Sequence, residues 1–272
     1  MALPTRPRRP FREPRRIRGI PLRAVIPNAV TALALCSGLS GIRFAISGNW
    51  EEAVTFVLIA GVLDGLDGRV ARMLHGESRF GAELDSLSDA ISFGVAPALI
   101  LYMWSLQTLP RFGWIAALML AVFCALRLAR FNAAIDADDQ PHKSAGFLTG
   151  VPAPAGAALA LLPMFSWFWT GEAWLREPML VAPWTALAAV LMGSSVATFS
   201  WTSFRLRRTI RFEAILVVVV VGAAAVSAPW HTLMALCLLY LLSIPFSVVS
   251  YTRVKRLRAS GVIPPSARMP SA

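Results

Sequence analysis

Residues 61–89 read GVLDGLDGRVARMLHGESRFGAELDSLSD, and this stretch places charged residues between two apolar runs. The runs cover residues 51–71 and 87–106, and each has about the 20 residues that a membrane-spanning helix needs. Polar residues and a glycine around positions 74–80 separate the runs and predict a turn. The stretch therefore predicts two consecutive, antiparallel transmembrane helices joined by a short connection.

Four aspartates lie on this predicted hairpin. Asp64 and Asp67 are three residues apart on the first helix, and Asp85 and Asp89 are four residues apart on the second. Both spacings put two side chains on one face of a helix, so the hairpin brings the pairs together at the inner edge of the membrane. An aspartate inside a membrane costs roughly 2.5–3.5 kcal/mol, and neighbouring carboxylates repel one another. The arrangement therefore requires a cation.

A divalent metal ion is the simplest source of that charge. Arg72 supplies a single positive charge near four acids, whereas one or two divalent ions would balance them. Ligands that are all oxygen favour hard ions such as Mg²⁺ or Mn²⁺ over zinc, and Mg²⁺ commonly recruits substrate phosphates. Gly61, Gly65, Gly68 and Gly81 fit such a site, because they leave room for a diphosphate or a neighbouring helix.

The composition of the whole chain extends the membrane prediction. Of 272 residues, 56% are hydrophobic and only 15% are charged, with a mean hydropathy of +0.60; a soluble domain carries roughly 25% charged residues. We expect an all-α, polytopic membrane helix bundle of about eight transmembrane helices, in which a six-helix core precedes two C-terminal helices. The expected spans are 27–47, 51–71, 87–106, 113–132, 150–170, 179–199, 212–229 and 231–251.

The basic residues predict the orientation of the bundle. If the spans alternate, all of the 26 Lys and Arg residues except Arg43, Arg111 and Arg176 fall on one side. The positive-inside rule places that side, both termini and the acid cluster in the cytoplasm. This topology accounts for the net charge of +11 without a nucleic-acid partner. The expected regions are a basic, Pro- and Arg-rich cytoplasmic tail at 1–25, a membrane domain at 26–252 and a cytoplasmic tail at 253–272.

Two other classes of function are compatible with acids in a membrane. Intramembrane carboxylates also occur in ion- or proton-coupled transporters, but a proton relay does not need a glycine beside each acid, and the chain shows no internal repeat. A non-catalytic scaffold would not need the complete acid set. Zinc or redox chemistry is disfavoured, because Cys36, Cys124 and Cys237 are far apart and no CxxC occurs.

The hairpin carries a spacing pattern that resembles a known signature. It runs Asp64-x2-Asp67-Gly68-x2-Ala71-Arg72-x8-Gly81-x3-Asp85-x3-Asp89. This pattern is similar to the complete signature of the class-I CDP-alcohol phosphatidyltransferases. These integral membrane enzymes transfer a phosphoryl-bearing group from a CDP-linked donor to an alcohol and release CMP. The resemblance therefore implies an enzyme that acts at the membrane surface.

Further segments resemble the branch of this family that accepts serine, the bacterial phosphatidylserine synthases. They are SDAISFGVAP at 88–97, RLARFN at 127–132 and FLTGVPAP at 147–154, while IPNAVT at 26–31 resembles the Pro-Asn-x-x-Thr start of the family as a whole. The implied reaction converts CDP-diacylglycerol and L-serine into phosphatidylserine and CMP at the cytoplasmic face of the bacterial inner membrane. Glycerol 3-phosphate or inositol phosphate stays open as the acceptor of a sister enzyme. The resemblance also implies a homodimer.

The same resemblance assigns roles to residues of the hairpin. It implies that Asp64, Asp67 and Asp85 bind a divalent ion, Mg²⁺ or Mn²⁺, and that Asp89 is the general base and can ligate a second ion. The residues implied for binding the CDP-linked donor are Asn28, Thr31, Gly68, Ala71, Arg72 and Gly81.

Acceptor binding is predicted from charge. Serine is a zwitterion, so its pocket needs a cation for the carboxylate. Arg127 and Arg130 lie three residues apart at the end of the fourth predicted helix and are candidates. Asn132 is a candidate hydrogen-bond donor. The alternative for both arginines is that they only extend from a helix end towards the aqueous phase.

Overall fold

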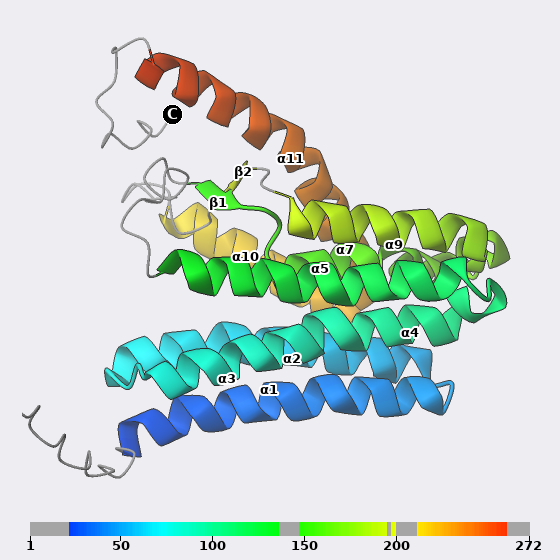
Figure 1. Cartoon of the computed structure of the whole chain (residues 1–272), viewed down its shortest axis with the longest axis horizontal. Coiled ribbons are helices and arrows are strands. Elements are labelled where there is room, and N and C mark those ends of the chain that lie inside the picture. The colour runs from blue at the N-terminus through cyan, green and yellow to red at the C-terminus, as the bar shows by residue number, and fades with distance from the viewer. Residues whose placement is uncertain (1–21, 136–146, 195–196, 200–210, 260–272) are drawn as a thin grey trace, which may run out of the picture.

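A computed structural model describes residues 22–135, 147–194, 197–199 and 211–259 of the chain. Within these ranges the long helices lie roughly antiparallel in a bundle (Figure 1). The helices are α1 (Leu22–Ile46), α2 (Trp50–Leu74), α3 (Arg79–Asp89), η1 (Ala90–Val95), α4 (Ala96–Trp104), η2 (Leu106–Thr108), α5 (Phe112–Ile135), α7 (Ala153–Ala160), α8 (Leu162–Thr170), η3 (Ala173–Arg176), α9 (Pro178–Gly193), α10 (Arg211–Ser227) and α11 (Pro229–Ala259). The strands β1 (Phe147–Thr149) and β2 (Ala197–Phe199) pair antiparallel.

The helical membrane bundle predicted from composition is confirmed, and each predicted span falls mainly on helical residues. Within the described ranges, four helical segments are long and apolar enough to cross a membrane: Val25–Ile46, Arg79–Trp104, Phe112–Ala133 and Pro229–Val249. Helix α2 is as long as α1, but acids and arginines interrupt its apolar sequence. The count of eight spans and the cytoplasmic termini stay predictions, and the predicted basic tail at 1–25 lies almost entirely outside the described residues.

Two predicted spans differ in detail from the observed helices. The span at 150–170 is divided at Leu161 into α7 and α8, because Pro163 cannot donate a backbone hydrogen bond inside a continuous helix. The span at 179–199 ends as a helix at Gly193, and β2 follows in an extended conformation. Apolar composition alone does not separate a helix end from a short strand.

The third predicted span contains a wide π-helical turn, η1, which begins directly after Asp89. Glycines bring this turn close to two helices. A Cβ on Gly38 of α1 would lie 2.5 Å from the Ser92 hydroxyl, and a Cβ on Gly94 would lie 3.0 Å from the Cβ of Cys124 on α5. The turn is therefore held between α1 and α5, and this packing fixes where Asp89 sits.

An arginine joins several elements at the end of the bundle opposite the α2–α3 connection. The guanidinium of Arg176 lies 5.8 to 5.9 Å from the ring centres of Trp50, Trp104 and Trp167. Its Nε donates a hydrogen bond of 2.8 Å to the Trp104 carbonyl, and the Ser105 hydroxyl donates one of 2.7 Å to the Arg176 carbonyl. These contacts hold the first turn of α2 against α4 and α8.

Candidate active site

The α2–α3 connection is a tight turn with a cap on each side. Helix α2 ends at Leu74, its C-cap His75 adopts φ +50°, and the Gly76 amide donates to the Ala71 carbonyl at 3.0 Å. Ser78 then caps α3, because its hydroxyl accepts a hydrogen bond from the Gly81 amide at 3.0 Å. The turn lies inside the predicted range 74–80 and reverses the chain, so that the acids of α2 and α3 face one another.

The predicted gathering of acids is present. Asp64, Asp67 and Asp85 each offer a carboxylate oxygen, and these oxygens lie within 4.8 Å of one another. Asp67 is only 5% exposed, whereas Asp64 and Asp85 are half-buried. The carboxyl group of Asp89 is in hydrogen-bonding contact with that of Asp64. Three acids therefore form a compact group from two helices, and the fourth adjoins it.

Helix α1 fixes one oxygen of this group. The Thr31 hydroxyl donates a 2.6 Å hydrogen bond to Oδ2 of Asp67, and Thr31 is itself only 4% exposed. The Ser88 hydroxyl of α3 donates to the Thr31 carbonyl at 3.3 Å. A buried hydrogen bond to a charged group is shorter and stronger than one between neutral groups. Thr31, predicted as a donor-binding residue, thus also orients Asp67.

A cavity of about 310 Å³ opens between α1, α2 and α3 beside these acids. Asp67 and Asp85 line one part of it. All residues predicted to bind the CDP-linked donor line it as well: Asn28, Thr31, Gly68, Ala71, Arg72 and Gly81. The structure therefore joins the predicted donor residues and two of the predicted metal ligands in one cavity.

The three predicted acceptor residues, in contrast, make contacts with different parts of the structure. Arg127 is half-buried and lies close enough to Asp89 for their charges to interact. Its Nε is buried and has no hydrogen-bond partner among the described residues. Arg130 is exposed and donates to the Gly193 carbonyl at 3.1 Å, which places a cation at the C-terminus of α9. The side-chain amide of Asn132 donates to the Ser86 hydroxyl at 2.9 Å.

Sequence reasoning missed several neighbours of the site. Ser86 and Ser88 connect α3 to α5 and α1; Ser86 carries no motif signal, and Ser88 begins the segment at 88–97 without having been assigned a role. Tyr240 of α11 also lies within electrostatic range of Arg127. No spacing rule links residues 127 and 240, so only the fold reveals that α11 reaches this region.

The three-carboxylate group fits a hard divalent cation. The donor set contains only oxygens, comes from two rigid helices and is held in part by Thr31. Such a set suits Mg²⁺ or Mn²⁺ better than zinc. Nearby ionised carboxylates repel one another, so a positive partner makes the arrangement electrostatically more favourable.

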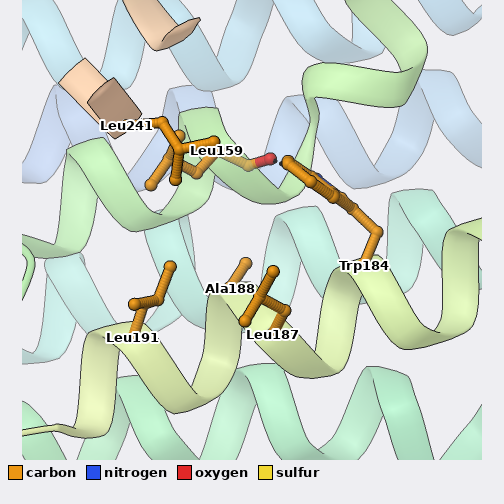
Figure 2. A pocket seen from close by; sticks show the side chains of 6 residues that line it. All are labelled: Leu159, Trp184, Leu187, Ala188, Leu191 and Leu241. Atoms are coloured by element: carbon orange, nitrogen blue, oxygen red, sulfur yellow. Dashed lines mark hydrogen bonds between the residues drawn. The ribbon is translucent and has the colours of Figure 1, made fainter. Parts of the chain in front are cut away.

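A second recess, between α7, α9 and α11, has a different chemistry (Figure 2). The side chains lining it are apolar apart from the indole nitrogen of Trp184, which donates a 2.7 Å hydrogen bond to the Leu159 carbonyl. No titratable side chain lines the recess. It is therefore a packing feature, and the acid-lined cavity is the candidate active site.

Gly68 offers a direct test of the cavity. A Cβ at Gly68 would meet no protein atom within 4 Å, and the same holds for Gly65, which is exposed and does not line the cavity. We expect Gly68→Leu to lower turnover about 100-fold or more, because the side chain fills space that a diphosphate would occupy and small misplacements cost about that much. Product formation per membrane-inserted protein measures this. Gly65→Leu is the matched control and should retain activity; equal activity of the two variants would show that Gly68 only packs.

Comparisons with known proteins agree with this site. The family model described as CDP-alcohol phosphatidyltransferase matches residues 24–201, which include the acid cluster and the whole cavity lining. A second model, described as CDP-alcohol phosphatidyltransferase 2, matches residues 210–245 of α10 and α11.

Three similar proteins carry the name CDP-diacylglycerol–serine O-phosphatidyltransferase. The protein of Mycobacterium tuberculosis is 39% identical over 240 residues, covering 88% of this chain and 82% of the relative. The Mycobacterium leprae protein is 38% identical over 237 residues, covering 86% and 78%. The Bacillus subtilis protein is 34% identical over 172 residues, covering 63% and 88%.

Proposed function

Because this chain belongs to the CDP-alcohol phosphatidyltransferase family, we propose that it transfers the phosphatidyl group of CDP-diacylglycerol to the hydroxyl of L-serine. The products are phosphatidylserine and CMP. As a member of the family with long apolar helices, it is an integral membrane phosphotransferase. The observation that carries the proposal is the single cavity that joins the donor-binding residues to the acid cluster. The name shared by its relatives supports serine as the acceptor.

The proposed step is one substitution at phosphorus. The serine hydroxyl oxygen forms a bond to the phosphorus of the phosphatidyl group. The bond from that phosphorus to the oxygen bridging to CMP breaks, and CMP leaves with that oxygen. Asp89 accepts the hydroxyl proton. Its place supports this role, because it adjoins the three-acid group without belonging to it, and a base must lie within hydrogen-bond reach of the proton it removes.

The remaining residues bind and orient. Asp64, Asp67 and Asp85 would hold Mg²⁺ or Mn²⁺, with Thr31 keeping Asp67 in place. When bound, such an ion neutralises charge on the donor diphosphate. Arg72 lines the cavity and supplies a positive charge to phosphate oxygens. The diacylglycerol chains remain in the surrounding lipid.

The arrangement of helix ends supports a cytoplasmic active site in a bacterial inner membrane. Helices α1 and α3 begin, and α2 and α5 end, at the same end of the bundle (Figure 1). Arg72, Arg79, Arg127 and Arg130 lie at this end, as the positive-inside rule requires of a cytoplasmic face. The homodimer stays a prediction, because a single chain is described.

A scan of acceptors tests the proposed reaction. The full chain in detergent or liposomes receives CDP-diacylglycerol, Mg²⁺ or Mn²⁺, and either serine, glycerol 3-phosphate or inositol phosphate. We expect CMP release and a phosphatidylserine product with serine only. Turnover with another acceptor alone would reassign the enzyme to a sister reaction. Ion flux through liposomes without any CMP release would instead support the transporter.

Arg127 is the acceptor-binding residue that the structure favours, because it faces Asp89 while Arg130 caps α9. Replacing Arg127 by glutamine should raise the KM for serine about 10- to 100-fold, since a hydrogen bond to a charged group is worth about 1.5–3 kcal/mol. The KM for CDP-diacylglycerol should change little. Arg130→Gln is the matched comparison and should have a much smaller effect. An unchanged KM for serine in Arg127→Gln would remove this residue from the acceptor pocket.

A further inference from the structure

One charged side chain of the cavity has no part in the reaction described above. Glu77 lies in the α2–α3 turn and lines the cavity together with its neighbours Gly76 and Ser78. Its carboxylate makes no hydrogen bond or ion pair with any residue that the structure describes. An exposed acid is ordinary on a protein surface, but this one borders a cavity that would receive a dianionic diphosphate. Its negative charge is therefore unsuited to binding the phosphates of the donor.

The position of the turn relative to the acids shows which part of the donor reaches it. Ser78 caps the start of α3, and Asp85 lies about two turns further along the same helix. At a rise of 1.5 Å per residue, the turn therefore lies roughly 10 Å from the acid cluster. A nucleoside monophosphate can span this length. The diacylglycerol part must stay in lipid, whereas the turn lies at one end of the bundle (Figure 1), between the helix ends that carry Arg72 and Arg79. With the diphosphate at the acids, the nucleoside extends towards the turn.

Most of the other side chains near the turn offer no free polar atom to read a base. Gly76, Ala71 and Ala82 have no polar side-chain atoms, and the Ser78 hydroxyl already accepts from the Gly81 amide as the cap of α3. Arg72 carries the charge suited to phosphate. Two side chains therefore remain as hydrogen-bond acceptors at this end of the cavity among the described lining residues: Glu77, and Asn28, whose Oδ1 would lie 2.7 Å from a Cβ on Gly81. Of the two, Glu77 carries the negative charge that would distinguish an amine from a carbonyl on the base.

Building on the proposed function, we propose that Glu77 selects the cytosine base of the donor by accepting a hydrogen bond from its exocyclic amine. Cytosine presents an amino donor at this position, and a carboxylate is a suitable acceptor for it. Uracil presents a carbonyl oxygen at the same place, which a carboxylate repels. Glu77 is thus a specificity-determining residue for the nucleotide, separate from the acids that bind metal.

The test compares two donors that differ only in the base. The full chain, the Glu77→Gln variant and the Glu77→Ala variant are assayed with CDP-diacylglycerol and UDP-diacylglycerol, with serine and Mn²⁺. Glutamine can both accept from the cytosine amine and donate to the uracil carbonyl. We expect the preference for the cytosine donor in kcat/KM to fall roughly tenfold or more in Glu77→Gln, as loss of one base-reading contact implies. Glu83→Gln is the matched control, because Glu83 lies on the same hairpin outside the cavity lining, and it should keep the wild-type preference.

Equilibrium binding of CMP and UMP in the presence of Mn²⁺ gives a second readout that does not need turnover. The ratio of the two dissociation constants should fall in Glu77→Gln by a similar factor and stay constant in Glu83→Gln. An unchanged ratio in Glu77→Gln overturns the inference, even if the wild-type protein makes phosphatidylserine. Conversely, a wild-type protein that prefers CMP through Glu77 but transfers nothing to serine would refute the proposed reaction and support the nucleotide contact.

Discussion

Replacing Asp89 by asparagine should lower serine-dependent CMP release about 10²- to 10⁴-fold, the range that a positioned general base contributes. Asparagine has nearly the size of aspartate but cannot take the hydroxyl proton. Asp89 adjoins the three-acid group, next to Asp64 and within charge range of Arg127. The variant should therefore still bind CDP-diacylglycerol, and rates measured at saturating donor and serine should show the loss in kcat.

Two measurements separate a lost base from a lost fold or a lost metal. Stabilisation by Mn²⁺ against thermal unfolding should persist in Asp89→Asn, because Asp64, Asp67 and Asp85 remain. Glu52→Gln makes the same chemical change in the first turn of α2, at the other end of the bundle, and should leave turnover intact. Full CMP release by Asp89→Asn would contradict its role as the base.

The hairpin could be predicted from sequence because its signals are local. A turn between two apolar runs and acids at spacings of three and four residues suffice to put four carboxylates on facing helices. The structure places one carboxylate oxygen each of Asp64, Asp67 and Asp85 within 4.8 Å of one another, as this geometry requires. The residues predicted to bind the donor on α2 and α3 line the cavity for the same reason.

Other features depend on contacts between distant parts of the chain and were not predictable. Arg127 and Arg130 look equivalent in sequence, yet Arg130 donates to the Gly193 carbonyl of α9 and only Arg127 faces the acids. The wide turn after Asp89 packs closely against Gly38 of α1 through Ser92, a contact between residues more than 50 positions apart. Hydropathy also cannot show that β2 replaces the end of a predicted helix.

Asp85→Asn is the most informative variant of the acid cluster, because it should affect stability in opposite ways without and with metal. Without metal, Asp85 faces the negative charges of Asp64 and Asp67. The neutral asparagine relieves that repulsion, so the metal-free variant should unfold at the same temperature as the wild type or at a higher one. With Mn²⁺ at 100 times its dissociation constant, the wild-type protein should gain about 2.7 kcal/mol of stability, as binding to the folded state alone dictates.

The variant should lose most of this gain and should also lose turnover. The loss of turnover should exceed the about 10- to 100-fold that removal of a group supporting a metal ligand costs, since a ligand itself is removed. Thermal unfolding is measured in chelator and in Mn²⁺ for wild type, Asp85→Asn and the control Glu83→Gln. The experiment gives both the stability of the metal-free protein and the stability gained from Mn²⁺. A metal-free Asp85→Asn protein that is clearly less stable than wild type would mean that Asp85 acts through packing. Retention of the full Mn²⁺ gain would mean that the ion lies elsewhere, because a group of three carboxylate oxygens cannot lose one without weakening its hold on a divalent cation.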